Sequence, residues 1–303
     1  MISRMRIGID LGGTKTELIA LDDTGAECLR LRRPTPAGDY SATLNLMAGM
    51  VAEAEKQLDV HASIGIGTPG ALAGNSGRMQ NCNSTCLNGR PLKQDMETIL
   101  NREVRMANDA NCFALSEAVD GAGRGAEIVF GVILGTGVGA GIVIHQRVLT
   151  GANGIAGEWG HNPLPRPKDE ERPGPECYCG RRGCIETWLS GPGMTAGHLS
   201  TSGVLLSARE IAGLAASGDA ASSATLARYT DRLARALAGV INILDPDIIV
   251  LGGGLSHIAS LYTQVPTLWG EHIFSPTVRT RLLPPQHGDA SGVRGAAWLW
   301  EAS

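Results

Sequence analysis

Residues 157–186 constrain this chain more than any other segment, because they can fold around a metal ion. The candidate ligands are one histidine and three cysteines: His161, Cys177, Cys179 and Cys184. Thiolate and imidazole are the ligands that a tetrahedral zinc ion prefers. Gly180 and Gly183 let the chain turn back, so that the third cysteine can join the first two. Four protein ligands leave no open position, so the predicted zinc is structural. The alternative is a set of buried thiols or a disulfide.

A metal ion at this position would also hold two acidic side chains near each other. Glu158 lies three residues before His161, and Glu186 lies two residues after Cys184. Carboxylates accept hydrogen bonds, which a site that binds many hydroxyl groups requires. The segment therefore predicts a ligand rich in hydroxyl groups beside a structural metal.

Composition narrows the class of protein. A chain of 303 residues, 43% hydrophobic and 18% charged, is typical of a soluble globular protein with two domains or one large one. A net charge of −4 argues against a nucleic-acid or anionic-membrane partner. The uncharged run 128–144 could be mistaken for a membrane span, but its alternating glycines favour two strands around a turn. Arg4 and Arg6 lead into a strand-like run, unlike a signal peptide, and reduced thiols predict the cytoplasm.

Hydrophobic periodicity predicts alternating strands and helices. Strands are expected at 5–10, 16–21, 27–32, 63–67, 104–107, 128–134, 139–145, 247–251 and 277–283. Helices are expected at 39–58, 92–101, 108–119, 207–217, 220–244, 256–269 and 291–300, with polar loops at 75–89 and 165–175. The opening order of strand, glycine turn and strand recurs at 128–145, which indicates two similar α/β halves.

The turn after the first predicted strand carries groups that bind phosphate. Backbone N–H groups of Gly12 and Gly13 can approach an anion. Thr14 adds a hydroxyl and Lys15 a positive charge, while Asp10 could hold a magnesium ion through water. The turn leads into a strand, so it is not a P-loop. The alternative is a plain hairpin turn with a solvated lysine.

Two further glycine turns are predicted to bind the nucleotide. Their residues are Gly135, Thr136, Gly137 and Gly139 in one turn, and Gly252, Gly253 and Gly254 in the other. The first repeats the phosphate turn in the second half of the chain. The second follows a buried strand, where a base and ribose could lie against bare backbone.

Asp109 is the candidate catalytic base. It stands with Asn108 and Asn111 at a strand-to-helix junction, where it could accept a proton from a sugar hydroxyl. Phosphoryl transfer needs little else beyond positioning, a metal and charge stabilisation. An ordinary helix N-cap is the alternative, since Asp is favoured there.

Five segments together resemble the ROK family (repressors, open reading frames and sugar kinases). They are residues 10–15, 108–111, 135–137, 158–161 and 177–186, and the similarity runs from Arg6 to about Trp300. Within the family, residues 81–89, 161–165 and 287–295 are most similar to bacterial fructokinases. The helix from Asn108 to Ala118 is shared with bacterial N-acetylglucosamine kinases.

The resemblance implies an actin-like, hexokinase-type (ribonuclease H-like) duplicated α/β fold with an interdomain cleft. It implies a smaller domain of residues 1–116 with 290–303, and a larger domain of residues 117–289 with the zinc loop. ATP, magnesium and a structural zinc are the implied cofactors, and a homodimer is the implied assembly. By position, Asp109 would be the general base. The residues implied to bind the sugar are Gly70, Asn83, Asn108, Asp109, Glu158, His161 and Glu186.

The expected function is transfer of the ATP γ-phosphoryl group to the 6-hydroxyl of fructose, and also of mannose. A kinase for N-acetylglucosamine or glucose is the nearest alternative, because pocket shape decides between sugars and spacing does not reveal it. A sugar-responsive transcriptional regulator is the alternative from another class. Family regulators carry a helix-turn-helix ahead of the first strand, and only four residues precede Met5 here.

Overall fold

The computed structural model describes residues 5–74, 76–82 and 84–300. Its internal contacts divide the chain into two compact units. The first unit runs to Gly125 and adds Gly141–Ala156 and the chain from Gln286 onward. The second unit consists of Ala126–Ala140 and Gly157–Pro285.

A five-stranded sheet forms the centre of the first unit, in the order β3-β2-β1-β4-β7. Its strands are β1 (Arg6–Leu11), β2 (Lys15–Leu21), β3 (Glu27–Pro34), β4 (Ser63–Thr68) and β7 (Val104–Asn108). β1, β2 and β3 pair antiparallel, whereas β4 lies parallel to β1 and to β7. β1 and β4 are buried almost throughout, as central strands covered on both faces should be.

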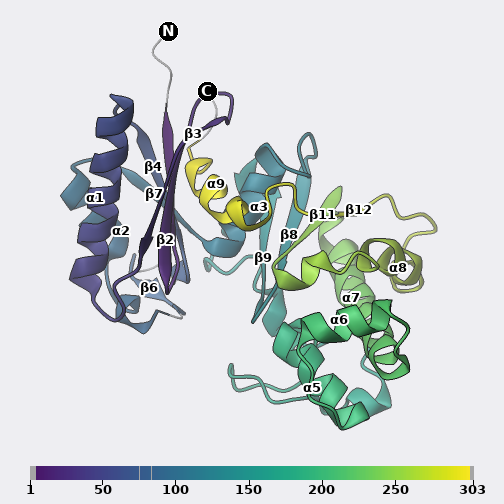
Figure 1. Cartoon of the computed structure of the whole chain (residues 1–303). Helices are drawn as coiled ribbons and strands as arrows, with labels where there is room; N and C mark the ends of the chain where they lie inside the picture. The colour runs from purple at the N-terminus through teal and green to yellow at the C-terminus, as the bar shows by residue number, and fades with distance from the viewer. Residues whose placement is uncertain (1–4, 75, 83, 301–303) are drawn as a thin grey trace. The chain divides into compact units, whose positions relative to one another are not determined.

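Helices cover both faces of this sheet (Figure 1). α1 (Tyr40–Leu58) and α2 (Leu92–Leu100) lie on one face, and α3 (Asp109–Val119) and α9 (Ser291–Ala297) lie on the other. The shorter elements are β5 (Ala71–Leu72), β6 (Met79–Gln80) and the 3₁₀ turns η1 (Thr85–Leu87) and η6 (Gly288–Ala290). Asp39 caps α1 by accepting a hydrogen bond from the Ala42 N–H at 2.9 Å.

Glycines let α9 pack against backbone on two sides. A Cβ on Gly65 in β4 would lie 1.8 Å from the carbonyl oxygen of Ala296. A Cβ on Gly295 would lie 1.7 Å from the carbonyl oxygen of Cys112 in α3. No side chain fits at these distances, so glycine is required for α9 to lie between the sheet and α3.

The second sheet repeats the first. Its order is β10-β9-β8-β11-β12, with strands β8 (Ile128–Leu134), β9 (Val138–Ile144), β10 (Arg147–Val148), β11 (Ile248–Gly252) and β12 (Arg281–Leu283). β8 is the central strand of this sheet, as β1 is of the first. β11 and β12 extend it in parallel on one side, and β9 and β10, which pair antiparallel with each other, lie on the other side. The same connectivity in both sheets confirms the internal duplication predicted from the glycine turns.

Around the second sheet lies a group of helices and 3₁₀ turns. The α-helices are α4 (Ile185–Leu189), α5 (Gly191–Ser202), α6 (Ala208–Ala216), α7 (Ala220–Leu244) and α8 (Leu261–Leu268). The 3₁₀ turns are η2 (Trp159–His161), η3 (Asp169–Glu171), η4 (Gly254–His257) and η5 (Trp269–His272). α7 packs against α5, α6 and α8, and its buried residues include Tyr229, Leu233 and Leu237.

Two sequence expectations about secondary structure are wrong, and some elements were not expected. Residues 256–269 do not form one helix, because they include the end of the turn η4, the helix α8 and the start of the turn η5, and Pro266 is tolerated inside α8. The strand expected at 277–283 begins at Arg281. Among the elements not expected is α5, although proline is favoured in the first helical turn and Ser190 caps this helix.

The uncharged run 128–144 forms β8 and β9, as the alternating glycines predicted. Among the described residues, no helix is both apolar enough and long enough to cross a bilayer.

Candidate functional site

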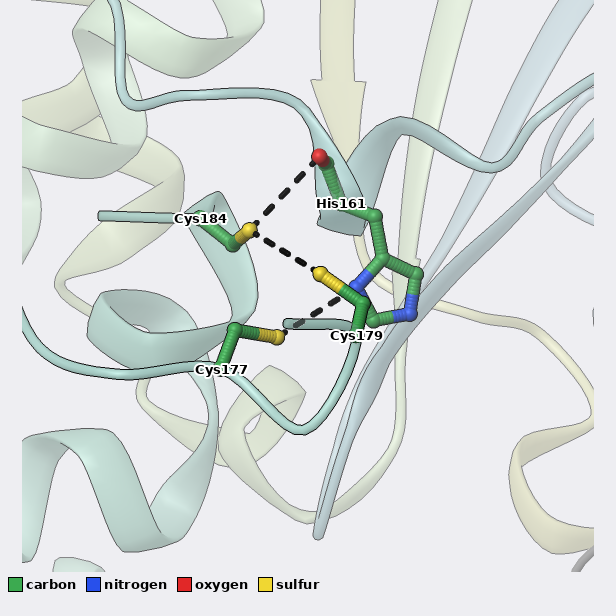
Figure 2. A group of neighbouring side chains, drawn as sticks. All are labelled: His161, Cys177, Cys179 and Cys184. Atoms are coloured by element: carbon green, nitrogen blue, oxygen red, sulfur yellow. Dashed lines mark hydrogen bonds between the residues drawn. The ribbon is translucent and has the colours of Figure 1, made fainter. Parts of the chain in front are cut away.

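The four predicted metal ligands converge in the second unit (Figure 2). The ligand atoms of His161, Cys177, Cys179 and Cys184 all lie within 4.8 Å of one another. His161 Nδ1 lies 3.5 Å from the Cys177 sulfur, and the Cys179 and Cys184 sulfurs lie 3.6 Å apart. The other ring nitrogen of His161 points away from the sulfur atoms.

These distances fit a shared zinc ion. A tetrahedral zinc with ordinary bond lengths holds two sulfurs about 3.8 Å apart, and a sulfur and a nitrogen about 3.6 Å apart. A disulfide would need the sulfurs to be about 2 Å apart, and all seven cysteines are free. Burial and the neighbouring thiols Cys179 and Cys177 raise the pKa of Cys184 to about 12. A bound divalent cation would therefore be needed to stabilise three thiolates at such short distances from one another.

Backbone hydrogen bonds shape the loop that carries the cysteines. The N–H of Cys177 donates to the carbonyl of Arg181 at 2.8 Å, and the N–H of Gly180 donates to the carbonyl of Cys177 at 2.9 Å. Gly180 and Gly183 have φ of 85° and 67°, a region that favours glycine. The turn-back inferred from these glycines is therefore present, and Cys184 then serves as the N-cap position of α4.

Both predicted glutamates lie beside this cluster. Glu158 immediately precedes η2, and Glu186 lies in the first turn of α4. Between the ligands Cys177 and Cys179 stands Tyr178, whose hydroxyl lies 2.9 Å from His161 Nε2. Partial burial, then the charges of Glu186, Cys177 and Glu158, raise the pKa of Tyr178 to about 12. The phenol, the imidazole and the two carboxylates thus form one polar group of the second unit.

In the first unit, the catalytic candidate and the first phosphate turn line one cavity of about 610 Å³. Its lining includes Asp10, Gly12, Gly13, Thr14 and Asp109. Burial and the charge of Asp109 raise the pKa of Asp10 to about 6. The two negative charges repel each other in this cavity, and a bound divalent cation would offset the repulsion. Carboxylate oxygens are ligands that magnesium prefers.

Asp109 is the first residue of α3, where Asn108 performs the capping. The Asn108 side chain accepts a hydrogen bond from the Asn111 N–H at 2.9 Å. The N-cap alternative for Asp109 is therefore wrong, because the cap is the residue before it. Asp109 Oδ1 accepts a hydrogen bond from the Ala110 N–H at 2.8 Å, which orients its carboxylate.

Lys15 and Gly70, which were also expected to bind ligand in the first unit, are not among the residues that line this cavity. Lys15 forms an ion pair with Glu17, with Nζ 3.8 Å from Oε2. Gly70 is required by packing, since a Cβ would lie 2.5 Å from the Cys82 sulfur. Asn83 lies outside the described residues.

A second cavity, of about 1290 Å³, lies in the second unit. Of the residues predicted to bind nucleotide, it is lined by Gly135, Thr136 and Gly254. Gly253 stands beside it with φ of 78°, and a Cβ there would lie 2.5 Å from the Leu134 carbonyl oxygen. Gly139 lies in β9, and its carbonyl accepts a hydrogen bond from the Trp159 indole at 3.4 Å.

Most of this second cavity was missed in the sequence. α6, α7 and the segment after β11 contribute residues that include Ala208, Arg209, Ala212, Ser223, Leu226, His257 and Gln264. Most of these side chains are small or uncharged, and together they form no sequence motif that indicates a binding site. The run of small residues in α6 is a signal that could have indicated room for a ligand, but it was not used.

The two sheets of equal connectivity, with a cluster of one histidine and three cysteines in the second unit, define an actin-like protein of the hexokinase type. The chain belongs to the ROK family, whose model matches residues 6–303. It is 41% identical to an N-acetyl-D-glucosamine kinase of Salmonella gallinarum over 299 residues, 97% of this chain and 99% of that protein.

Solved structures agree with this assignment. The ROK hexokinase from Thermus thermophilus has a TM-score of 0.86 at 28% identity, over 97% of each chain. A ROK family glucokinase from Streptomyces griseus, solved in complex with glucose and AMPPNP, has a TM-score of 0.75 at 26% identity, over 97% of this chain and 98% of that chain. The fold class expected from the resemblance is confirmed.

Proposed function

We propose that this protein transfers the γ-phosphoryl group of ATP to the 6-hydroxyl of a hexose. The observation that carries the proposal is the cavity of about 610 Å³, where Asp109 and the glycine turn after β1 line one space. A carboxylate that can accept a proton and backbone N–H groups that can bind phosphate are the two parts that phosphoryl transfer requires. The similarity to sugar kinases, one of them solved with glucose and a nucleotide analogue, supports the same activity.

Asp109 acts as the general base in this proposal. Its carboxylate takes the proton of the 6-hydroxyl as that oxygen attacks the γ-phosphorus, and ADP leaves with the electrons of the broken P–O bond. The N–H group of Gly13 binds a phosphate oxygen, with Thr14 as a further donor. The Gly12 N–H instead closes the turn, because it donates to the Lys15 carbonyl at 3.0 Å. Magnesium, held through Asp10, would neutralise charge on the phosphates.

The nucleotide has a separate place in the proposal. The cavity of about 1290 Å³ in the second unit takes the adenosine, with the backbone at Gly254 beside the base and Thr136 toward the phosphates. Cavities that bind such ligands are mostly apolar with a few polar groups, as this one is.

The acceptor is held by the two carboxylates and the imidazole of the polar group, beside the candidate metal ligands. Glu158 and Glu186 accept hydrogen bonds from sugar hydroxyls, and His161 donates one through Nε2. Zinc would have a purely structural role, because four protein ligands leave it no position for a substrate.

N-acetyl-D-glucosamine is the better supported acceptor. The support is the 41% identity, over nearly the full length of both chains, to a kinase named for that sugar. Fructose, expected from residues 81–89, 161–165 and 287–295, is the second candidate. Of those segments, residues 84–87 line the cavity that Asp109 also lines.

A panel of sugars tests the proposal. Purified protein is given ATP and magnesium with N-acetylglucosamine, glucose, mannose or fructose, and product is followed by ³¹P NMR. We expect a 6-phosphate product, with the highest kcat/KM for N-acetylglucosamine. Absence of turnover with every hexose would reject the kinase, and a preference for fructose would restore the expectation from the motifs.

A further inference from the structure

Tyr178 stands in an unusual position in the metal loop. It lies between the ligands Cys177 and Cys179, and 83% of its side chain is exposed. An exposed tyrosine on a glycine-rich loop would ordinarily be free to point into solvent. Its hydroxyl instead lies 2.9 Å from His161 Nε2, and the two rings meet edge to face with centroids 5.1 Å apart.

The metal determines what His161 can offer to that hydroxyl. Nδ1 faces the Cys177 sulfur at 3.5 Å, so Nδ1 is the nitrogen that would bind zinc. A neutral imidazole bound to metal through one nitrogen carries its proton on the other. Nε2 is then a hydrogen-bond donor, and the Tyr178 oxygen accepts from it.

The phenol has a second partner available. Glu158 and Glu186 flank the same cluster, one just before η2 and the other in the first turn of α4, and a phenol O–H can donate to a carboxylate. An oxygen that accepts from an imidazole and can donate to a carboxylate has the hydrogen-bonding pattern of a sugar hydroxyl.

We propose that the Tyr178 hydroxyl competes with the acceptor sugar for the Nε2–H group of His161. The inference rests on the proposed function, in which that group binds a sugar hydroxyl. The N–H points in a single direction, so a well-aligned hydrogen bond goes to one oxygen at a time. The acceptor must therefore displace the phenol. Because the ring is exposed, it can turn outward without disturbing the buried core, and the displacement lowers the apparent affinity for the sugar.

Tyr178→Phe tests the competition, since it removes the hydroxyl and keeps the ring. We expect the KM of the preferred hexose to fall about three- to tenfold, as for loss of one neutral hydrogen bond. The kcat, the KM of ATP and one bound zinc per chain should stay unchanged. Tyr40→Phe is the matched control, because it removes a phenol that hydrogen bonds to Asp95 in the first unit, and it should leave the hexose KM unchanged.

A measurement that does not depend on turnover accompanies the kinetics. In zinc-loaded protein labelled with ¹⁵N-histidine, the Nε2–H resonance of His161 should shift in Tyr178→Phe. It should also shift in the wild type when N-acetylglucosamine or fructose is added without nucleotide. Calorimetric titration of the same sugars should show the dissociation constant falling by the factor seen in KM.

The outcomes separate the competition from the proposed function. If the wild type binds sugar but phosphorylates none, the proposed kinase activity is rejected, while the binding data still test the competition. An unchanged dissociation constant with zinc retained overturns the competition, as does absence of sugar binding by both proteins. A raised KM in Tyr178→Phe also overturns it, because the phenol would then be helping to bind the acceptor.

Discussion

The carboxylate of Glu186 accepts a hydrogen bond from the backbone N–H of Val138, 2.9 Å away. Glu186 lies two residues after the metal ligand Cys184, and Val138 directly follows the glycine turn at 135–137. A Cβ on Gly137 would lie 2.8 Å from the same carboxylate oxygen, so the turn must carry glycine at this point. The metal loop and the turn predicted to bind phosphate are therefore joined through one acidic side chain.

The charge of Glu186 should matter more than its shape. In Glu186→Gln the amide oxygen can still accept from Val138, whereas the hydrogen bonds from sugar to a charged group weaken. We expect kcat/KM for the hexose to fall about ten- to hundredfold, with the melting temperature nearly unchanged. Steady-state kinetics and calorimetry measure both quantities. Glu176→Gln, an exposed carboxylate of the same loop paired with Arg182, is the control and should change kcat/KM less than about twofold.

Replacing the base should stop the chemical step and leave the fold intact. In Asp109→Asn the side-chain oxygen can still accept the Ala110 N–H, and Asn108 still caps α3. We expect kcat to fall about 10²- to 10⁴-fold while ATP binding persists. Asp59→Asn changes a helix-terminal residue with a left-handed backbone that asparagine tolerates, and it should keep full activity. A variant at position 109 that retains more than about a tenth of kcat would mean that another group is the base.

Loss of one metal ligand should release the loop. Cys184→Ser removes a buried thiol of the cluster, so bound zinc should fall from one per chain toward zero, and amide exchange across residues 157–186 should accelerate. Cys28→Ser removes an exposed, free thiol and should affect neither measurement. Elemental analysis and exchange mass spectrometry provide the readouts. Retention of one tightly bound zinc by Cys184→Ser would show that the metal does not depend on this cysteine.

Packing around α9 gives a test that involves no ligand. Gly295→Ala would place a methyl group 1.7 Å from the Cys112 carbonyl oxygen, so α3 and α9 must separate. We expect a loss of about 1–3 kcal/mol or more in the free energy of unfolding, measured by urea denaturation. Gly49→Ala, at an exposed position of α1 with no neighbour within 4 Å, should gain about 0.5–1 kcal/mol instead. Equal stability of the two variants would contradict the close packing.

The parts of the structure that carry strong local signals were predictable from the sequence. His161 and Cys184 carry imidazole and thiolate groups, the donor types that a tetrahedral zinc prefers, so the cluster could be predicted, and glycines such as Gly183 indicate where the loop turns. The duplication was visible because both halves need a glycine turn between their first two strands. Alternation and helical spacing gave most of the strands and helices to within a few residues.

The rest depends on tertiary packing, which spacing does not encode. α6 and α7 line a large cavity with side chains such as Ala212 and Leu226, which look like any other helix surface. The ion pair of Lys15 with Glu17, on the same strand β2, was likewise not expected, and binding of phosphate by Lys15 stays a prediction. The hydroxyl of Tyr178 meets His161 because the metal loop folds back, and nothing in the order of residues indicates that contact.

The titration of Asp10 tests the electrostatics of the first cavity. Burial is the main cause that raises its pKa to about 6, and the charge of Asp109 is the next. The ionised carboxylate is thus less favourable in the folded protein than in the unfolded chain, where its pKa is about 4. By linkage, this group lowers the free energy of unfolding as pH rises from about 4 through 6, and its stabilising contribution is fully present only below that window.

Carboxyl ¹³C NMR should therefore find Asp10 titrating near pH 6 in the ligand-free protein. Asp109→Asn removes one like charge and should lower that pKa, whereas Glu103→Gln, on the surface, should not move it. Magnesium with ATP should lower the pKa further, because a bound cation favours the ionised form. A pKa near 4 in the wild type would mean that Asp10 is well solvated, and an unchanged value in Asp109→Asn would mean that the two carboxylates do not act on each other.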